Sequence, residues 1–259
     1  MTLTPTLLDY DVESTDWDGP FELVTCKKAL HPSSLGDVRY SLNPYMGCEH
    51  GCIYCFAPGH LHADVSTWRV VRVKTNIVDR LSREIDFTEG IIGLGSVTDP
   101  YQAAEGRFRL SRMCLEVLQR KRREVFVLTK SPLVLRDMDI LRDMNCTVML
   151  SITNPDTRIC RMTEPGAPTA EERLHAVKEL IDNGIRAGVF IAPVLSSLEG
   201  HETELARMIS KTGAKEAFID GFKERSVDLQ RMDRMGIHAS PECVKRMRME
   251  CEDHGLRVL

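Results

Sequence analysis

The stretch that decides the fold is Tyr45-Met46-Gly47-Cys48-Glu49-His50-Gly51-Cys52-Ile53-Tyr54-Cys55-Phe56. Its three cysteines are separated by three and then by two residues, and thiolates on such a compact loop hold iron–sulfur clusters or zinc. A four-iron cluster takes four ligands, so three cysteines would leave one iron open to a small molecule. The spacing therefore predicts a metal centre with chemistry at its open position.

A structural zinc site is the alternative that this loop leaves open. His50, His60 and His62 lie in or just after the loop, and one of them could complete a Cys3His ligand set. Such a site would be closed and would only stabilise the loop. The protein would then be a non-catalytic, zinc-stapled binding protein.

Length and composition limit the classes of protein that the chain can represent. With 259 residues it can bury one substantial core, and α/β barrels of this size commonly form a single domain. A formal net charge of -4 argues against a protein that coats nucleic acid nonspecifically. The nine cysteines are odd in number and include a metal-type cluster, which indicates a reducing cytoplasm. No run of about 18 apolar residues occurs, so we expect no membrane association.

Short apolar runs alternate with longer amphipathic runs after the cysteine loop, which is typical of βα units in a parallel sheet. The six predicted strands are 38–42, 91–95, 125–129, 147–152, 187–192 and 216–219. We therefore predict an α/β fold, a partial (β/α)6 TIM-like barrel over residues 38–222. Residues 1–37 would form an N-terminal extension packed on the barrel, and residues 223–259 a C-terminal helical segment of the same domain.

The helix between the fourth and fifth strands has the clearest boundaries in the sequence. Thr169 and Glu172 form a capping box, an apolar stripe follows, and Asn183-Gly184 marks the end. Another helix precedes the third strand, and its apolar face includes Cys114. We therefore expect Cys114 to be a small core residue and no ligand.

Polar residues follow most of the predicted strands. The second strand leads into residues 96–99, the third into Lys130, the fourth into Thr153 and Asn154, and the fifth into Pro193. The carboxyl ends of parallel strands meet at one edge of a sheet or barrel. We therefore expect these groups to converge with the cysteine loop on one rim.

Four sequence blocks, taken with the cysteine loop, resemble the spore photoproduct lyase-like family of the radical SAM superfamily. The blocks are Gly93-Leu94-Gly95-Ser96-Val97-Thr98-Asp99-Pro100-Tyr101, Leu128-Thr129-Lys130-Ser131, Leu150-Ser151-Ile152-Thr153 and Ile191-Ala192-Pro193-Val194. They occur in the right order at strand ends. The resemblance covers roughly residues 38 to 222.

The resemblance implies a chemistry and its cofactors. Cys48, Cys52 and Cys55 would bind a 4Fe-4S cluster whose open iron chelates S-adenosylmethionine (SAM). An electron from a ferredoxin- or flavodoxin-type donor would release a 5'-deoxyadenosyl radical, which abstracts hydrogen from an organic substrate. Analogy to the lyases suggests a nucleic acid lesion or a modified nucleotide as substrate. Radical modification of a protein or peptide side chain is the alternative.

The resemblance also assigns residues to SAM. Tyr54 and Phe56 would flank the adenine, and Lys130 would pair with the methionine carboxylate. Ser151 would form a hydrogen bond to the cofactor, and Ala192-Pro193 would present backbone to the adenine. A lysine offers point-charge pairing to a carboxylate, and short hydroxyls suit ribose or carboxylate contacts. On general grounds, Lys130 could instead be a solvated loop residue and Ser151 an ordinary strand residue.

Other polar residues of this rim also have two interpretations. Many radical SAM enzymes carry a glutamate after the second strand that accepts the SAM amino group. Thr98 or Asp99 would replace it here, or would simply form a turn before Pro100. Thr153 and Asn154 would contact the cofactor, or would be a polar strand residue and part of a turn.

Ser96 is the main departure from the lyases, which resemble one another in carrying a hydrogen-donating cysteine at this position. A serine O–H bond is too strong to quench a carbon radical readily, so we expect this chain to lack that repair cycle. Glu164-Pro165-Gly166 also matches the family near the rim, with a plain turn as the alternative. Arg173, in the first turn of a helix, is expected to be solvated.

Overall fold

The computed structural model describes residues 10–12, 21–222 and 229–259. Its main element is an eight-stranded sheet with the order β12-β11-β10-β9-β8-β7-β4-β3. The strands are β3 (Leu30–Pro32), β4 (Val38–Leu42), β7 (Ile91–Leu94), β8 (Val125–Thr129), β9 (Cys146–Ser151), β10 (Ala187–Val194), β11 (Glu216–Gly221) and β12 (Arg257–Val258). The six neighbours from β4 to β11 pair in parallel, whereas β3 is antiparallel to β4.

These six parallel strands are the six that the sequence predicts, so the predicted α/β fold with a parallel sheet is confirmed. β4 and β8 have the predicted bounds, and β7 ends one residue earlier, at Leu94. β10 and β11 run two residues further, to Val194 and Gly221. The core residues of these strands, such as Leu42 and Val127, are fully buried.

A smaller sheet carries the cysteine loop. Its order is β1-β2-β6-β5, with β1 (Tyr10–Val12), β2 (Phe21–Cys26), β5 (Tyr45–Met46) and β6 (Val71–Lys74). β5 and β6 are antiparallel, with Tyr45 opposite Val73. The chain between them, residues 47–70, is therefore one long excursion from a hairpin. This excursion holds the three cysteines, α1 (Ala57–His60) and η2 (Val65–Thr67).

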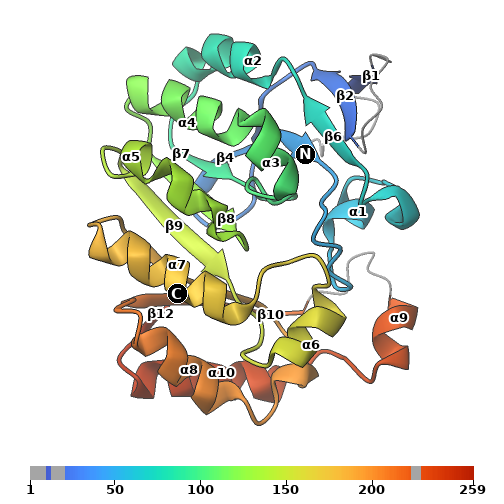
Figure 1. Ribbon diagram of the computed structural model, residues 1–259, viewed down its shortest axis with the longest axis vertical. Helices are drawn as coiled ribbons and strands as arrows, with labels where there is room; N and C mark the ends of the chain where they lie inside the picture. The colour runs from blue at the N-terminus through green and yellow to red at the C-terminus, as the bar shows by residue number, and fades with distance from the viewer. Residues whose placement is uncertain (1–9, 13–20, 223–228) are drawn as a thin grey trace.

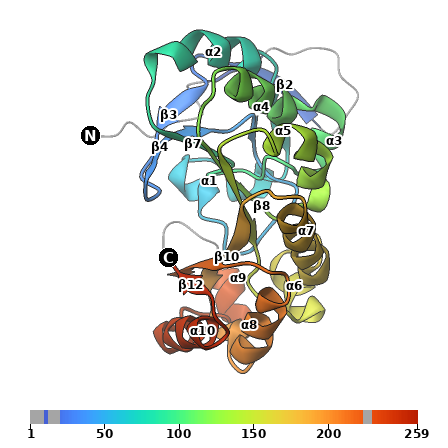
Figure 2. The same cartoon turned by 90° about the vertical axis from the view of Figure 1, so that its left-hand side faces the viewer.

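Helices connect the parallel strands and pack outside them (Figures 1 and 2). The longer helices are α2 (Ile77–Glu84), α3 (Ala103–Phe108), α4 (Leu110–Arg120), α6 (Thr157–Thr163), α7 (Ala170–Asp182), α8 (Glu202–Ser210), α9 (Leu229–Arg234) and α10 (Pro241–Asp253). The shorter ones are α5 (Met138–Leu141), η3 (Ile85–Phe87), η4 (Pro132–Asp137) and η5 (Ser196–Leu198). In Figure 1, α1, α6 and α9 lie on the right, the side to which the β9 arrow points. No described helix is long and apolar enough to cross a membrane.

The predicted capping box is confirmed at the start of α7. Thr169 Oγ1 accepts a hydrogen bond from the Glu172 amide at 3.2 Å, and the Glu172 carboxylate accepts one from the Thr169 amide at 2.7 Å. The helix ends at Asp182 with Asn183 as its C-cap, before Gly184 in the left-handed region (φ +78°). Cys114 lies on the inner face of α4 and is fully buried, as expected of a core residue.

A second, small apolar cluster joins the C-terminal segment to the cysteine loop. Ile53 and Tyr54 of the loop pack with Leu195, which follows β10, and with Met232 and Ile237 of the C-terminal segment. The Ser196 amide donates to the carbonyl of His238 at 2.9 Å, which ties that segment to the end of β10. The C-terminal segment therefore covers one side of the cysteine loop.

Candidate functional site

The cysteine loop begins at a glycine that no other residue could replace without a shift of the backbone. Gly47 has φ +88°, and a Cβ atom there would lie 2.4 Å from the carbonyl oxygen of Val70. The next amide, that of Cys48, donates to the carbonyl of Trp68 at 2.9 Å. The first cysteine is thus held against residues 68–70, which end the 47–70 segment just before β6.

Two polar side chains from the segment after β7 clamp the same loop. Thr98 Oγ1 donates to the carbonyl of Gly47 at 2.5 Å, and Gln102 Nε2 donates to it at 3.1 Å. Gln102 Oε1 accepts a hydrogen bond from the Glu49 amide at 2.9 Å. Gln102 is fully buried, so its amide satisfies backbone groups on both sides of Cys48 that would otherwise have no partner.

The last residue of α6 and the segment after it hold the loop from another direction. The Ile53 amide donates to the carbonyl of Thr163 at 2.9 Å, and the Gly166 amide donates to the carbonyl of His50 at 2.9 Å. A Cβ atom on Gly166 would lie 2.3 Å from the Glu49 carbonyl oxygen, so only glycine allows this approach. The Glu164-Pro165-Gly166 run is therefore a docking segment for the cysteine loop as well as a turn.

The three loop thiols are half-buried and unpaired with any other cysteine. Burial raises the pKa of Cys52 to about 12 against the opposing charge of Lys130, and it also raises the pKa of Cys48 and Cys55. Thiolates are the form that binds metal, so these residues need a cation to hold them charged. Three soft ligands on one clamped loop fit an iron–sulfur cluster.

The zinc alternative would require a histidine as fourth ligand. Within residues 10–12, 21–222 and 229–259, no three Cys, His, Asp or Glu side chains already surround one point as the ligands of a single ion do. His50 is buried, and its Nδ1 lies 3.5 Å from Asp99 Oδ2. His60 stands at the end of α1 beside the half-exposed ring of Phe56, with the ring centroids 5.9 Å apart. The two histidines thus have other neighbours.

Glu164 is the centre of a buried polar network behind the cysteine loop. Its Oε2 accepts from the Arg173 guanidinium, and its Oε1 accepts from the Tyr54 hydroxyl. Oε1 also accepts from Thr153 Oγ1 at 2.8 Å and lies 3.3 Å from Lys130 Nζ. Side chains from the cysteine loop, from the segments that follow β8 and β9, and from α7 thus meet on one carboxylate. We call these five residues, with Ser151, the Glu164 network.

Arg173 is fully buried, so the expectation of a solvated arginine is wrong. Besides Glu164, its guanidinium donates to the carbonyl of Ser151 at 2.8 Å and to the carbonyl of Pro168. The helix cap places it over the end of β9, where these acceptors replace water. Because protein oxygen atoms accept hydrogen bonds from the guanidinium N–H groups, the buried charge of Arg173 is tolerated.

The charges of the network reinforce one another. Burial alone would raise the pKa of Glu164, but Lys130, Arg173 and the Tyr54 hydrogen bond lower it below its usual range. Burial would likewise lower the pKa of Arg173, and Glu164 outweighs this and raises it. Glu164 and Arg173 therefore form an ion pair throughout the neutral range. Burial and Glu164 together raise the pKa of Tyr54 well above its usual value, so its hydroxyl stays a donor.

Lys130 is held at the rim and is not a solvated loop residue. Its side chain is 12% exposed, and its Nζ donates to Ser151 Oγ at 2.6 Å. The same Nζ lies 5.6 Å from the centre of the Tyr54 ring. Lys130 and Ser151, two of the residues that the resemblance assigns to SAM, are therefore hydrogen-bonded to each other, and Tyr54 lies next to Lys130.

Asp99 ties together the ends of β7 and β8. Its Oδ1 accepts from Thr129 Oγ1 at 2.7 Å and from the Tyr101 amide at 2.8 Å, and its Oδ2 accepts from the Lys130 amide at 2.7 Å. This is the turn that the sequence offers as the alternative to a SAM contact. Asp99 as the acceptor for the SAM amino group stays a prediction.

The remaining predicted cofactor residues have distinct surroundings. Asn154 Nδ2 donates to the carbonyl of Ser197 at 2.7 Å, and its Oδ1 accepts from the Asp156 amide at 2.8 Å, so its side chain joins two loops. Phe56 is 43% exposed, whereas Tyr54 is buried. Ala192 and Pro193 are half-buried near the end of β10, joined by a cis peptide bond.

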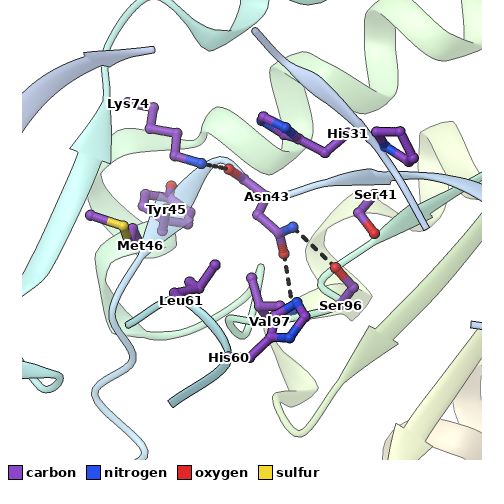
Figure 3. A pocket seen from close by; sticks show the side chains of 11 residues that line it. His31, Ser41, Asn43, Tyr45, Met46, His60, Leu61, Lys74, Ser96 and Val97 are labelled. Atoms are coloured by element: carbon purple, nitrogen blue, oxygen red, sulfur yellow. Dashed lines mark hydrogen bonds between the residues drawn. The ribbon is translucent and has the colours of Figure 1, made fainter. Parts of the chain in front are cut away.

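Ser96 follows β7 and lines a small pocket (Figure 3). Its Oγ accepts a hydrogen bond from Asn43 Nδ2 at 3.1 Å. Asn43 in turn follows β4, directly before the cysteine excursion. The position that the resemblance aligns with the hydrogen donor of the lyases thus lies at this pocket.

One family model matches most of the chain. The model of the radical SAM superfamily matches residues 42–213. The chain belongs to the radical SAM superfamily. An uncharacterized protein of Methanocaldococcus jannaschii is 34% identical over 180 residues, which are 68% of this chain and 68% of the relative. An uncharacterized protein of Mycobacterium bovis is 32% identical over 256 residues, which are 92% of this chain and 75% of that protein.

Solved structures show the same architecture. A spore photoproduct lyase superposes with a TM-score of 0.70 at 16% identity, covering 92% of this chain and 81% of the lyase. Streptococcus suis SuiB, bound to its precursor peptide SuiA, superposes with a TM-score of 0.57 at 14% identity, covering 86% of this chain and 48% of SuiB. The predicted resemblance to the lyase-like radical SAM fold is confirmed.

Gln102 and the contacts of Glu164 and Arg173 were not predicted as parts of the site. Gln102 lies three residues beyond Asp99, just outside a strong motif, and no local pattern marks a buried glutamine. For Arg173, the local signal for a place near the rim is its position in the first turn of α7, directly after the Thr169 cap. Glu164 and Arg173 are nine residues apart with a loop between them, so no helical or strand spacing predicts that the two side chains form an ion pair.

Proposed function

We propose that this radical SAM enzyme holds a 4Fe-4S cluster on Cys48, Cys52 and Cys55. The observation that carries the proposal is the clamped loop itself, in which three free, half-buried thiols are presented beside Lys130. Gln102 and Gly166 hold the backbone of that loop from two directions. Such pre-organisation suits a cofactor that must keep one coordination position free for a second molecule.

SAM is the second molecule that we propose for this rim. Lys130 would pair with its carboxylate and Ser151 would donate or accept beside it, since the two side chains already meet at 2.6 Å. The Glu164–Arg173 pair would keep Lys130 and Tyr54 in place, so little ordering would be needed when SAM binds. When bound, the cluster and SAM would supply a 5'-deoxyadenosyl radical after one-electron reduction. Radical SAM enzymes need an electron donor, and we propose one of the ferredoxin or flavodoxin type.

For the substrate we propose a modified nucleotide or a nucleic acid lesion, from which the radical abstracts hydrogen. The fold neighbours include a spore photoproduct lyase complexed with a dinucleoside spore photoproduct. Ser96 stands where the lyases carry a hydrogen-donating cysteine, so we propose a reaction other than their repair cycle. A protein or peptide side chain is the second candidate, favoured by the fold likeness to SuiB bound to a precursor peptide. Nine free cysteines suit a cytoplasmic location.

The proposal is tested by anaerobic reconstitution with iron and sulfide, reduction and addition of SAM. We expect 5'-deoxyadenosine and methionine in a mass spectrum, and their loss in Cys52→Ala. Cys114→Ala removes a buried thiol away from the loop and serves as the matched control, in which we expect SAM cleavage to persist. Stoichiometric zinc without SAM cleavage would show instead the stapled binding protein.

A further inference from the structure

Trp68 ends the turn by which the chain returns from the cysteine loop toward β6. The turn is fixed by Asp64, whose carboxylate accepts a hydrogen bond from the Ser66 amide at 2.8 Å. The Trp68 amide donates to the carbonyl of Val65 at 3.3 Å, and the Trp68 carbonyl accepts from the Cys48 amide at 2.9 Å. The backbone of Trp68 is therefore tied directly to the first cysteine of the loop.

The Trp68 side chain is held in the apolar core. It is 4% exposed and belongs to the main core cluster, together with Met46 and Leu61. Cys55, the third cysteine of the loop, packs against the same cluster. A close-packed core keeps its side chains in fixed rotamers. The indole ring therefore cannot turn its N–H group out to bulk water.

The indole N–H of Trp68 lacks an ordinary acceptor. Its Nε1 is buried, and no residue that the structure describes accepts a hydrogen bond from it in the usual geometry. The N–H of a buried tryptophan normally has a hydrogen-bond partner. A buried donor without one calls for an explanation, and a group that binds beside it is one such explanation.

The Cys55 thiol is the group that this N–H faces. Burial raises the pKa of Cys55, whereas the Ala57 amide, the charge of Lys130 and the Trp68 side chain lower it by stabilising the thiolate. The N–H is the only polar group of a tryptophan side chain, and it can only donate. A neutral thiol is a weak acceptor, and ionisation makes an acceptor stronger. The contact therefore gains most when Cys55 is a thiolate, which is the form that binds metal.

We propose that Trp68 is a positioning residue for the cluster, whose indole N–H donates to the Cys55 sulfur in the loaded protein and raises the reduction potential of the cluster. The inference rests on the proposed function, in which Cys55 is one of three cluster ligands. Hydrogen bonds to the sulfur atoms are among the factors that set the potential of such clusters.

The direction of the effect follows from charge. One-electron reduction adds a negative charge to the cluster and its thiolates, so a fixed N–H donor stabilises the reduced form more than the oxidised form. The electron comes from the external donor, which is oxidised, and no bond of Trp68 forms or breaks. Trp68 thus makes the cluster easier for that donor to reduce.

The test is an anaerobic potentiometric titration of the reconstituted protein without SAM, followed by electron paramagnetic resonance of the reduced cluster. In Trp68→Phe we expect the ratio of reduced to oxidised cluster at a fixed potential to fall roughly tenfold, a midpoint about 59 mV lower for one electron. Tyr101→Phe is the matched control, because it removes a polar atom from another buried aromatic side chain, whose ring lies 6.0 Å from the Arg136 guanidinium. We expect it to keep the wild-type midpoint.

A second variant separates the hydrogen bond from the packing of the ring. The chain has two tryptophans, so in a Trp17→Phe background the analogue benzothienylalanine replaces tryptophan at position 68 alone. The analogue keeps the two fused rings and has a sulfur atom in place of the N–H group. We expect its midpoint to fall as in Trp68→Phe, measured against Trp17→Phe with natural tryptophan at position 68.

Iron per protein and visible absorption report the cluster before each titration. A midpoint that is unchanged or higher with the analogue would overturn the inference and leave the proposed function standing. Loss of the cluster with the analogue would also overturn it, because the N–H would then hold the cluster and not tune it. A wild-type protein that takes up no iron–sulfur cluster would overturn the proposed function together with this inference.

Discussion

The Glu164 network and the Ser96 pocket both border the excursion that carries the cysteines, and both are polar, yet they are built in opposite ways. In the network, a fully buried carboxylate is saturated by Arg173, Tyr54, Thr153 and Lys130. In the pocket, Ser96 keeps a proton to donate and faces open space. A saturated network fixes geometry, whereas an unsaturated one can select a ligand. The difference separates groups whose hydrogen bonds are filled inside the protein from a hydroxyl that faces a pocket.

The comparison is tested most severely by removing the charge of Glu164. Glu164→Gln keeps the shape but leaves the Arg173 guanidinium buried without its counterion, which should destabilise the fold by roughly 3 to 5 kcal/mol. Urea unfolding of the reconstituted protein measures the loss. The double variant Glu164→Gln with Arg173→Met should recover part of it, since no buried charge is then left alone.

The exposed pair Lys178 and Asp182 on α7 supplies the control for that experiment. Lys178→Met removes an ion pair in water, and we expect no measurable change in unfolding. If Glu164→Gln also left the free energy of unfolding unchanged, the Glu164 network would not be what fixes the geometry of the site.

Loss of the Lys130 ammonium should affect a ligand more than the fold. Lys130→Met should weaken SAM binding by roughly 10- to 100-fold, because a charge-assisted hydrogen bond to the carboxylate is lost, while the iron content stays the same. Equilibrium dialysis with labelled SAM measures the affinity, and Ser151→Ala should give a smaller loss. Lys121→Met, at an exposed pair with Asp86, is the control. SAM affinity untouched in both Lys130 and Ser151 variants would refute the cofactor assignments.

Gln102 tests whether the hydrogen bonds that hold the cysteine loop fix the geometry of the site, as the Glu164 network does. Gln102→Leu leaves the Gly47 carbonyl and the Glu49 amide short of partners, at a cost of about 1 to 3 kcal/mol. We expect a lower iron content after reconstitution, measured against total protein. Gln119→Leu removes a glutamine that makes one long hydrogen bond on α4 and should retain full iron. Equal iron in the two variants would show that Thr98 alone suffices.

The smallest effect concerns pH. The folded protein holds the pKa of Glu164 below its unfolded value of 4.5, so this residue stabilises the fold above pH 4.5 and the stabilisation is lost as pH falls toward the folded pKa. Between pH 7 and pH 4 we expect a loss of about 1 kcal/mol from this group. Unfolding curves at both pH values should show it in the wild type and lack it in Glu164→Gln. A parallel fall in both proteins would assign the pH dependence to other carboxylates.

Much of the fold follows from local patterns in the sequence. The six strands and the capped helix α7 lie where the alternation of apolar runs and the Thr169–Glu172 box place them, because period and capping act over a few residues. Lys130 follows a predicted strand end, whereas the family resemblance assigns Ser151, the last residue of β9, and their mutual contact at 2.6 Å places the two on one rim.

The contacts that complete the site act over long distances in the sequence. Tyr54 meets Glu164 across 110 residues, and Gln102 reaches the Gly47 carbonyl across 55 residues. Neither the composition of the chain nor its hydrophobic periodicity predicts which buried carboxylate will accept a hydrogen bond from which donor. The solvated Arg173 expected from general statistics proved wrong for the same reason, since a nearby buried carboxylate reverses the usual cost of burying a charge.

By itself the sequence determined the three thiols, the parallel α/β sheet and the rim on which its polar residues gather, because spacing, periodicity and strand ends are properties of neighbouring residues. Tertiary structure alone decided that Glu164 and Arg173 pair in the interior, that Asp99 holds a turn, and that Lys74 and Ser96 share a pocket. Such meetings depend on how distant segments pack, and burial then fixes which charges and donors are satisfied and which remain open to a ligand.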